Sequence, residues 1–204
     1  MSDHYHFAEV AAPQGAPLFF LFHGTGGNEN DLIGLGKQLL PAVHLISPRG
    51  DVSEGGALRF FKRTGEGIFD MADFERAQQK VSAFVAEQIE RVRPSSVAAL
   101  GYSNGANTVA ALLFNTPQAI DVSVLMHPLI PFAPAPQPSL SGRKVLITAG
   151  RQDRLCPAPE TEKLGAYFED QGADLTLFWH EGGHQIRQEE LRAVKEYLGA
   201  EVRS

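Results

Sequence analysis

Gly101-Tyr102-Ser103-Asn104-Gly105 follows the apolar run Val97-Ala98-Ala99-Leu100 and precedes the helical run Ala106–Phe114. The apolar run is typical of a buried strand, so the five residues stand at a strand-to-helix turn. A serine between two glycines at such a turn is typical of a nucleophile elbow, which exposes the hydroxyl at the carboxyl end of the strand. We therefore predict that Ser103 is a nucleophile, rather than an idle serine in a glycine-rich turn.

A serine hydroxyl is a weak nucleophile at neutral pH, so Ser103 needs a base and a group that orients the base. Where this elbow motif occurs, the acid and then the histidine follow the serine along the chain. Asp153 comes just after the predicted strand Lys144–Gly150, and His184 comes just after Leu175–Trp179. All three would lie at the carboxyl edge of one parallel sheet. We predict a catalytic triad in which His184 takes the Ser103 proton and Asp153 orients the imidazole.

Each partner of Ser103 also has a plainer interpretation. Asp153 could be a turn residue that caps the helix beginning a few residues later. His184 could be a loop histidine held by its own backbone. His127 follows another apolar strand, Val122–Met126, and competes as the base. His127 precedes Asp153 in the chain, so a triad with His127 as the base would break the usual order. We therefore interpret His127 as a pocket-wall or packing residue.

The segment His180-Glu181-Gly182-Gly183-His184 also matches the His-Glu-x-x-His pattern of zinc proteases. That pattern works only on a helix, where both histidines share one face. Two adjacent glycines would cost such a helix about 1 kcal/mol each relative to alanine. The segment also follows a strand directly, and no third ligand is evident after it. We therefore expect no metal.

The loop His23–Gly27 follows an intensely apolar predicted strand, Leu18–Phe22. A glycine-rich loop at this place can turn its amides inward, and an oxyanion hole takes one amide from such a loop and one from the residue after the nucleophile. We predict the backbone amides of Thr25 and Asn104 as the two donors. The loop lacks the Gly-Lys-Ser/Thr ending of a P-loop and the Gly-x-Gly-x-x-Gly spacing of a dinucleotide site. A nucleotide is therefore not expected.

These motifs together resemble the phospholipase/carboxylesterase family of small bacterial α/β-hydrolases, over nearly the whole chain. The resemblance implies an α/β-hydrolase fold without a large lid domain, one domain over 1–204, and hydrolysis of small carboxylic esters through an acyl-enzyme, without a cofactor. Thioesterases and lysophospholipases with the same triad are related and remain the alternative. The likeness to dienelactone hydrolases is more distant, because those use a cysteine where this chain has Ser103. The segments that carry the resemblance are His23–Leu32, Ser47–Gly50, Gly101–Gly105, Ala149–Asp153 and Gly182–Gln185.

Substrate contacts are expected from the long connection between Pro48 and Met71, which is rich in phenylalanine. Connections of this length inside compact domains are usually functional or disordered, and this one is too aromatic for disorder. Its phenylalanines either anchor the loop to the core or form a shallow aromatic pocket beside the nucleophile. A shallow pocket would favour short acyl groups. The candidate substrate-binding residues are His23, Phe60, Phe61 and His127.

Composition narrows the function classes further. The chain has 204 residues, of which 43% are hydrophobic, and a formal net charge of −6. Such a chain is globular, and without a cluster of basic residues it is not expected to bind nucleic acid. The single cysteine, Cys156, fits a reducing compartment, and neither a signal peptide nor a membrane-spanning run is evident. We expect a cytoplasmic enzyme acting on a small-molecule ester; the sequence leaves a homodimer open.

Alternating apolar runs of strand and helix length predict a mostly parallel sheet covered on both faces by helices. No repeat or linker divides the chain. The Pro-rich stretch Pro128–Pro138 is expected to be a rigid loop near the site. Further predicted elements are the strand Val43–Ser47 and the helices Asp31–Leu40, Asp73–Arg93, Glu160–Asp170 and Gln188–Leu198.

Overall fold

The computed structural model describes residues 5–202 and shows a seven-stranded sheet in the order β1-β3-β2-β8-β9-β10-β11. All neighbouring strands are parallel except β1, which runs antiparallel to β3 at the edge. The predicted mostly parallel sheet is therefore confirmed, and its fold is that of the α/β-hydrolases. The strands of the sheet are β1 (Phe7–Val10), β2 (Leu18–Phe22), β3 (His44–Pro48), β8 (Val97–Tyr102), β9 (Val122–Met126), β10 (Lys144–Gly150) and β11 (Asp174–His180).

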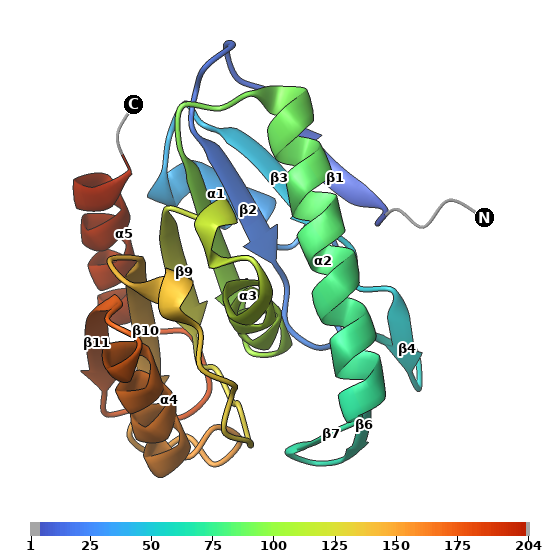
Figure 1. Ribbon diagram of the computed structural model, residues 1–204, viewed down its shortest axis with the longest axis vertical. Helices are drawn as coiled ribbons and strands as arrows, with labels where there is room; N and C mark the ends of the chain where they lie inside the picture. The colour runs from blue at the N-terminus through green and yellow to red at the C-terminus, as the bar shows by residue number, and fades with distance from the viewer. Residues whose placement is uncertain (1–4, 203–204) are drawn as a thin grey trace.

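Helices cover both faces of this sheet (Figure 1). On one face lie α2 (Met71–Val92), α3 (Asn104–Asn115) and α4 (Ala158–Asp170), and on the other lie α1 (Ile33–Leu39) and α5 (Gln188–Glu201). The central strand β2 shows why both faces need cover, because all five of its residues are buried. Phe20 and Phe22 belong to the core under α2 and α3, whereas Phe19 and Leu21 belong to the core under α1 and α5. A continuous apolar run is the pattern of a strand buried on both faces.

The connection between β3 and α2 is more ordered than expected. It contains two small antiparallel hairpins, β4 (Val52–Glu54) with β5 (Ala57–Arg59), and β6 (Arg63–Gly65) with β7 (Ile68–Phe69). The sequence had predicted only a long connection here. These strands are two or three residues long and mix polar with apolar side chains, so they carry no readable alternation.

Two other boundaries differ from expectation. The edge strand β1 was not predicted, because a four-residue strand interrupted by Glu9 is too short to show a clear apolar pattern. Helix α1 spans only Ile33–Leu39, shorter than the expected 31–40, since the side chains of Asn28 and Asp31 make a hydrogen-bonded turn before it.

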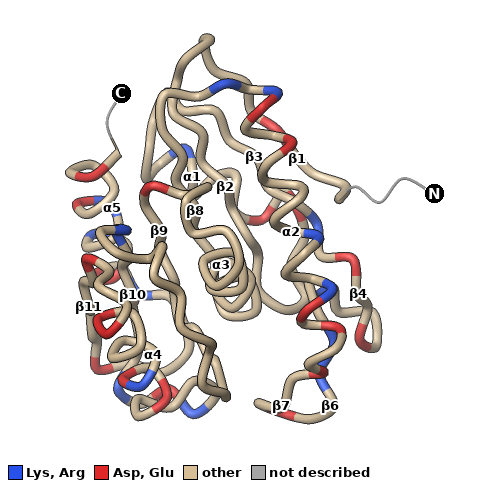
Figure 2. Tube along the Cα trace, viewed as in Figure 1, with Lys and Arg blue, Asp and Glu red and all other residues tan. Residues whose placement is uncertain are grey.

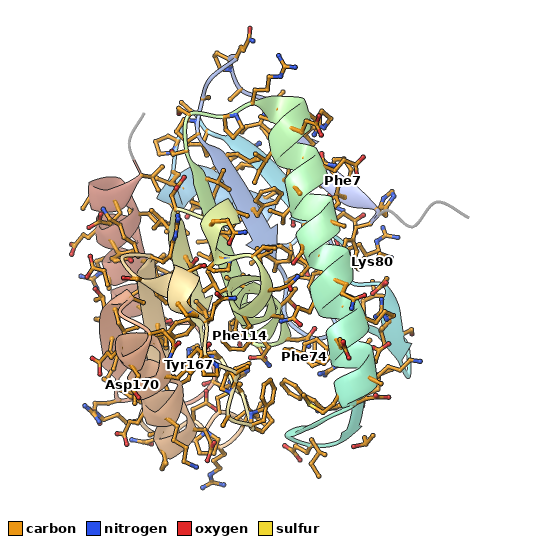
Figure 3. The ribbon with its side chains drawn as sticks, viewed as in Figure 1. Phe7, Phe74, Lys80, Phe114, Tyr167 and Asp170 are labelled. Atoms are coloured by element: carbon orange, nitrogen blue, oxygen red, sulfur yellow. The ribbon has the colours of Figure 1, made fainter. Side chains whose placement is uncertain are left out.

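The Pro-rich stretch Pro128–Pro138 is fixed by aromatic packing. Phe132 lies with its ring centroid 5.5 Å from that of Phe74 in α2 and 6.2 Å from that of Phe69. Figure 3 shows Phe74 and Phe114 on this face of the molecule, with Tyr167 of α4 beside Phe114 at a centroid distance of 5.5 Å. Leu129, from the same stretch, lines the cavity described below. The stretch is thus an anchored loop next to the candidate site, as expected.

Charged residues of both signs are spread along the outer helices α2, α4 and α5 rather than gathered into one basic surface (Figure 2). Within residues 5–202, every helix is too short or too polar to cross a membrane.

Candidate active site

Ser103 lies at the turn between β8 and α3 in an unusual backbone conformation. Its φ is 53° and its ψ is −116°, which few residues other than glycine adopt. A methyl group on Gly101 would collide with the Gly105 carbonyl, and one on Gly105 would collide with the Phe22 carbonyl of β2. The two glycines therefore let α3 start directly against the strands. This close packing explains the spacing of the motif and places the serine hydroxyl at the carboxyl edge of the sheet.

The structure brings Ser103, His184 and Asp153 into one hydrogen-bonded chain. His184 Nε2 is 3.0 Å from Ser103 Oγ, and His184 Nδ1 is 2.8 Å from Asp153 Oδ2. The Tyr102 hydroxyl donates to the His184 carbonyl at 2.9 Å, which helps to fix the loop that carries the histidine. The three side chains come from loops after β8, β10 and β11, so the parallel sheet alone aligns residues far apart in sequence.

Both oxygens of the Asp153 carboxylate are occupied. Oδ1 accepts the backbone amides of Leu155 and Cys156, each at 2.9 Å, and Oδ2 faces His184 and His127. Burial of the carboxyl alone would raise its pKa, but the hydrogen bonds from both imidazoles and the Cys156 amide outweigh burial and hold the pKa of Asp153 well below its usual range. Asp153 is therefore a turn residue before α4, but it does not cap that helix, whose N-cap is Pro157, and it also meets His184.

A buried polar cluster that was not predicted from the sequence lies behind Asp153. His127 Nδ1 is 2.8 Å from Asp153 Oδ2, and His127 Nε2 is 3.2 Å from Glu190 Oε1 of helix α5. Thr148 Oγ1 donates to the same Glu190 oxygen at 2.6 Å. The side chains of His127, Asp153 and Glu190 are all 0% exposed. The only sequence signal for this cluster was the position of His127 directly after a strand; Glu190 looked like one more charged helix residue.

The expected substrate contacts of His23, Phe60, Phe61 and His127 are wrong. All four are at most 1% exposed and lie outside the cavity beside Ser103. Phe60 packs on the His23 ring at a centroid distance of 4.8 Å, and Phe61 packs on Phe69 at 4.6 Å. His23 donates from Nδ1 to the Gly24 carbonyl and accepts the Gly50 amide at Nε2. The two phenylalanines are anchors of the hairpin segment, because apolar rings gain more from the core than from an open pocket.

The cavity beside Ser103 has a volume of about 480 Å³ and a mixed polar and apolar lining. Arg59 is one of its walls, although its side chain is only 6% exposed. Its guanidinium donates to Thr25 Oγ1 at 2.8 Å and to the Phe61 carbonyl at 3.2 Å, and so ties the hairpin segment to the loop after β2. The remaining lining residues are Thr25, Arg63, Glu66, Gly67, Phe69, Tyr102, Asn104, Asn107, Leu129, Leu155, Cys156 and His184.

Thr25 and Asn104, whose amides are the predicted oxyanion donors, both line this cavity together with Ser103. The Asn104 side chain is buried, and its Oδ1 accepts the Phe60 amide at 2.9 Å. The start of α3 and the loop after β2 are thereby both bound to the hairpin segment. The positions of Thr25 and Asn104 are compatible with the predicted role of their amides.

Among residues 5–202, two histidine-carboxylate groups have the spacing of metal ligands: His127 with His180 and Glu190, and His127 with Asp153 and His184. The proton positions do not suit a metal. His180 Nδ1 accepts the Gly182 amide at 3.0 Å, so the proton of the neutral ring must sit on Nε2, the atom that faces the cluster. In the second group both imidazoles turn Nδ1 toward one Asp153 oxygen, which is the pattern of two hydrogen bonds to a carboxylate. The two histidines of the His-Glu-x-x-His segment also point to different partners.

Residues 62–196 match the Dienelactone hydrolase family. The chain belongs to this family of small α/β-hydrolases. The resemblance drawn from the sequence motifs is confirmed, and the dienelactone hydrolases are nearer relatives than the motifs alone indicated.

Individual relatives agree with this assignment. The chain is 41% identical over 182 residues to MhqD of Bacillus subtilis (strain 168), which is named only provisionally as a hydrolase; the match covers 88% of this chain and 91% of MhqD. Among solved structures, the protein Atu2452 of unknown function from Agrobacterium tumefaciens str. C58 is 46% identical, with a TM-score of 0.91 and 97% of each chain covered. The Bacillus cereus carboxylesterase is 35% identical, with a TM-score of 0.88, covering 96% of this chain and 93% of the other. The protein is thus a carboxylesterase-like hydrolase.

Proposed function

We propose that the protein cleaves small carboxylic esters through a Ser103-His184-Asp153 triad and an acyl-enzyme intermediate. One observation carries the proposal: the two nitrogens of the His184 imidazole face Ser103 Oγ at 3.0 Å and Asp153 Oδ2 at 2.8 Å. This arrangement gives a serine both a base within hydrogen-bond reach and a carboxylate that fixes the base.

Each step of the proposed reaction has an atom that can carry it. Because His184 Nδ1–H donates to Asp153, the lone pair of Nε2 faces the Ser103 hydroxyl and can take its proton as the oxygen attacks the ester carbonyl. The tetrahedral oxyanion would be held by the amides of Thr25 and Asn104. The protonated Nε2 then gives its proton to the departing alcohol, which leaves an acyl group on Ser103. Water then attacks this ester. His184 Nε2 takes the proton of the water and returns it to the Ser103 oxygen, which releases the carboxylic acid.

The size of the substrate follows from the cavity. Its volume of about 480 Å³ is in the range of a small ligand, and its walls include Arg59, Arg63 and Glu66 beside apolar side chains. Each methylene of the acyl chain adds about 0.8 kcal/mol of binding free energy only where it is buried against apolar side chains. Long acyl chains would meet charged walls and solvent instead. Acetyl to butyryl esters are therefore proposed as better substrates than long-chain esters, lysophospholipids or thioesters of long acids.

A fluorophosphonate probe tests the nucleophile, and a series of aryl esters tests the substrate. We expect stoichiometric labelling of Ser103, and expect Ser103→Ala to lose both the label and about 10⁵- to 10⁶-fold of kcat. We expect kcat/KM to peak between acetyl and butyryl. Undiminished esterase activity in Ser103→Ala would refute the triad. A rise in kcat/KM out to palmitoyl, or a preference for thioesters over matched oxygen esters, would assign the protein to the thioesterases or lysophospholipases instead.

A further inference from the structure

His127 is held between two carboxylates in a part of the protein that water does not reach. Its Nδ1 lies 2.8 Å from Asp153 Oδ2, and its Nε2 lies 3.2 Å from Glu190 Oε1. All three side chains are 0% exposed. The same Asp153 oxygen meets Nδ1 of His184, also at 2.8 Å. Asp153 is thus held from two sides by imidazoles, of which only one reaches Ser103.

The proton positions around His127 follow from these contacts. A neutral imidazole has one protonated nitrogen, so one of the two carboxylates would face a lone pair. Two buried carboxylates without a cation are strongly destabilising. Burial alone would lower the pKa of His127, but its contacts with Asp153 and Glu190 outweigh burial and raise the pKa to about 9. The arrangement is that of an imidazolium with one N–H directed at each carboxylate.

The other neighbours of His127 do not supply a competing charge. The titratable groups that face it are Asp153, Glu190, His180, His184, Tyr102 and Cys156. His180 is neutral, because its Nδ1 accepts the Gly182 amide at 3.0 Å, and burial lowers its pKa. Burial raises the pKa of the Tyr102 hydroxyl to about 12 and also raises the pKa of the Cys156 thiol. Among these groups, the charges in contact with Asp153 are those of His127 and, during the reaction, His184.

The backbone of His127 is also specialised. Its φ is 53°, in the left-handed region that non-glycine residues rarely adopt, and its amide donates to the Thr148 carbonyl at 2.8 Å. The Cys156 thiol donates to the His127 carbonyl at 3.2 Å. Both backbone groups are thus fixed by strand β10 and by the loop that carries Asp153. A strained residue held on every side is typical of a functional position.

We propose that His127 is a positioning residue for the hydrolase reaction: a buried imidazolium that holds Asp153 in place against His184 and offsets part of the Asp153 charge. The inference rests on the proposed function, because it acts through the same triad. The offset has a direction. With a cation on the far side of Asp153, the carboxylate attracts a positive charge on His184 less strongly than an uncompensated carboxylate would.

The wild-type protein offers a test that needs no mutation. We expect ¹⁵N spectra of the imidazoles to show, at pH 8, one histidine with both ring nitrogens protonated and protected from exchange. This signal should disappear in His127→Asn. A wild-type spectrum at pH 8 in which every observed histidine lacks one ring proton would overturn the proposal.

Two substitutions separate the hydrogen bond from the charge. His127→Asn places an amide N–H near the position of Nδ1, so it keeps a bond to Asp153 but removes the charge. His127→Gln reaches toward Glu190 and loses the bond to Asp153. We expect His127→Gln to lower kcat by up to about 100-fold, the scale for a catalytic group displaced by about 1 Å, with KM little changed. His127→Asn should retain more of kcat, while the acidic limb of its kcat/KM profile moves to higher pH by roughly one unit.

His180→Gln is the matched control. His180 is buried in the same cluster, 3.4 Å from His127 Nε2, but it is neutral and has no hydrogen bond to Asp153. Its substitution disturbs the packing and leaves the charges in place, so the acidic limb should not move. Equal movement in His180→Gln and His127→Asn, or none in either, would overturn the proposal. Fluorophosphonate labelling of Ser103 in the wild type keeps this result separate from the proposed function: if labelling fails, the triad itself is refuted.

Discussion

Asp153 shows how much a single residue can combine at this site. One of its carboxylate oxygens orders the loop before α4 through two backbone amides, and the other meets two imidazoles. Any replacement therefore affects the loop, the base and the buried cluster at once. An isosteric change that keeps the loop bonds is the most informative one.

Asp153→Asn is predicted to lower kcat by about 10⁴-fold with the fold retained. The Asn oxygen can still accept the Leu155 and Cys156 amides, but its NH₂ group would face the N–H groups of His127 and His184. The His184 ring would then turn or change tautomer and stop accepting the Ser103 proton. Aryl acetate hydrolysis measures the rate, and circular dichroism checks the fold. Asp170→Asn, an exposed position on α4, is the control and should match the wild type. A near-normal rate in Asp153→Asn would move the acid role elsewhere.

At the scale of elements, the junction of β8 with α3 depends on how closely the helix approaches β2. The approach leaves no room for a side chain at position 105, where an added methyl would collide with the Phe22 carbonyl. The same approach sets the position of Ser103 relative to the loop that follows β2. Stability and geometry of the site are therefore coupled at this junction.

Gly105→Ala is predicted to lower the free energy of unfolding by about 1 to 3 kcal/mol, the range for an overpacked core, and to reduce kcat together with it. Urea unfolding and ester hydrolysis measure the two effects. Gly199→Ala is the matched control, because Gly199 also lies in a helix but an added methyl there meets nothing within 4 Å. Alanine should raise stability at that position by about 0.5 to 1 kcal/mol. An unaltered unfolding curve for Gly105→Ala would contradict the close packing.

The sequence was informative where elements are long and apolar. The strands β2, β9 and β10 were predicted with their observed bounds, because each is a mainly apolar run with at most two polar residues. Ser103, Asp153 and His184 could be predicted as neighbours because each follows such a strand. The hairpins between β3 and α2 could not be predicted, since two- and three-residue strands are set by contacts with the rest of the protein.

The buried cluster behind the triad escaped prediction for a related reason. Glu190 lies in a helix with charged neighbours, and nothing local distinguishes a carboxylate that turns inward from one that faces water. Phe60 and Phe61 were misread because an aromatic pair in a long connection fits a pocket wall as well as an anchor. Only the path of the chain, which gives both rings 0% exposure, decides between these two roles.

Buried charged groups of the molecule are paired with charges of the opposite sign, and these pairs make its stability depend on pH. The pKa of His127 is raised from 6.5 to about 9 on folding, so its contribution is fully present below pH 6.5 and is lost as pH rises through 9. The pKa of Glu29 is lowered from 4.5 to about 2, mainly by its hydrogen bonds to Arg49. Its contribution is present above pH 4.5 and is lost as pH falls through 2.

We predict that the melting temperature falls between pH 7 and pH 10, as His127 loses its proton and leaves two buried carboxylates without their cation. Calorimetry at fixed ionic strength measures the effect. His127→Asn should melt lower at pH 7 and should show a smaller decline toward pH 10. Parallel curves for the two proteins over this range would show that another group governs the alkaline loss.

The hairpin segment between Pro48 and Met71 is a place where the substrate range of the protein can change. It contributes Arg59, Arg63 and Phe69 to the cavity, yet none of its strands belongs to the main sheet. It connects the end of β3 to the start of α2, and the buried rings of Phe60 and Phe61 anchor it to the core. Changes confined to the turns of the two hairpins would alter the cavity lining, while the bonds of Arg59 to Thr25 and of the Phe60 amide to Asn104 keep the segment in place. Substrate range can then change through a few loop residues, without changes in the main sheet.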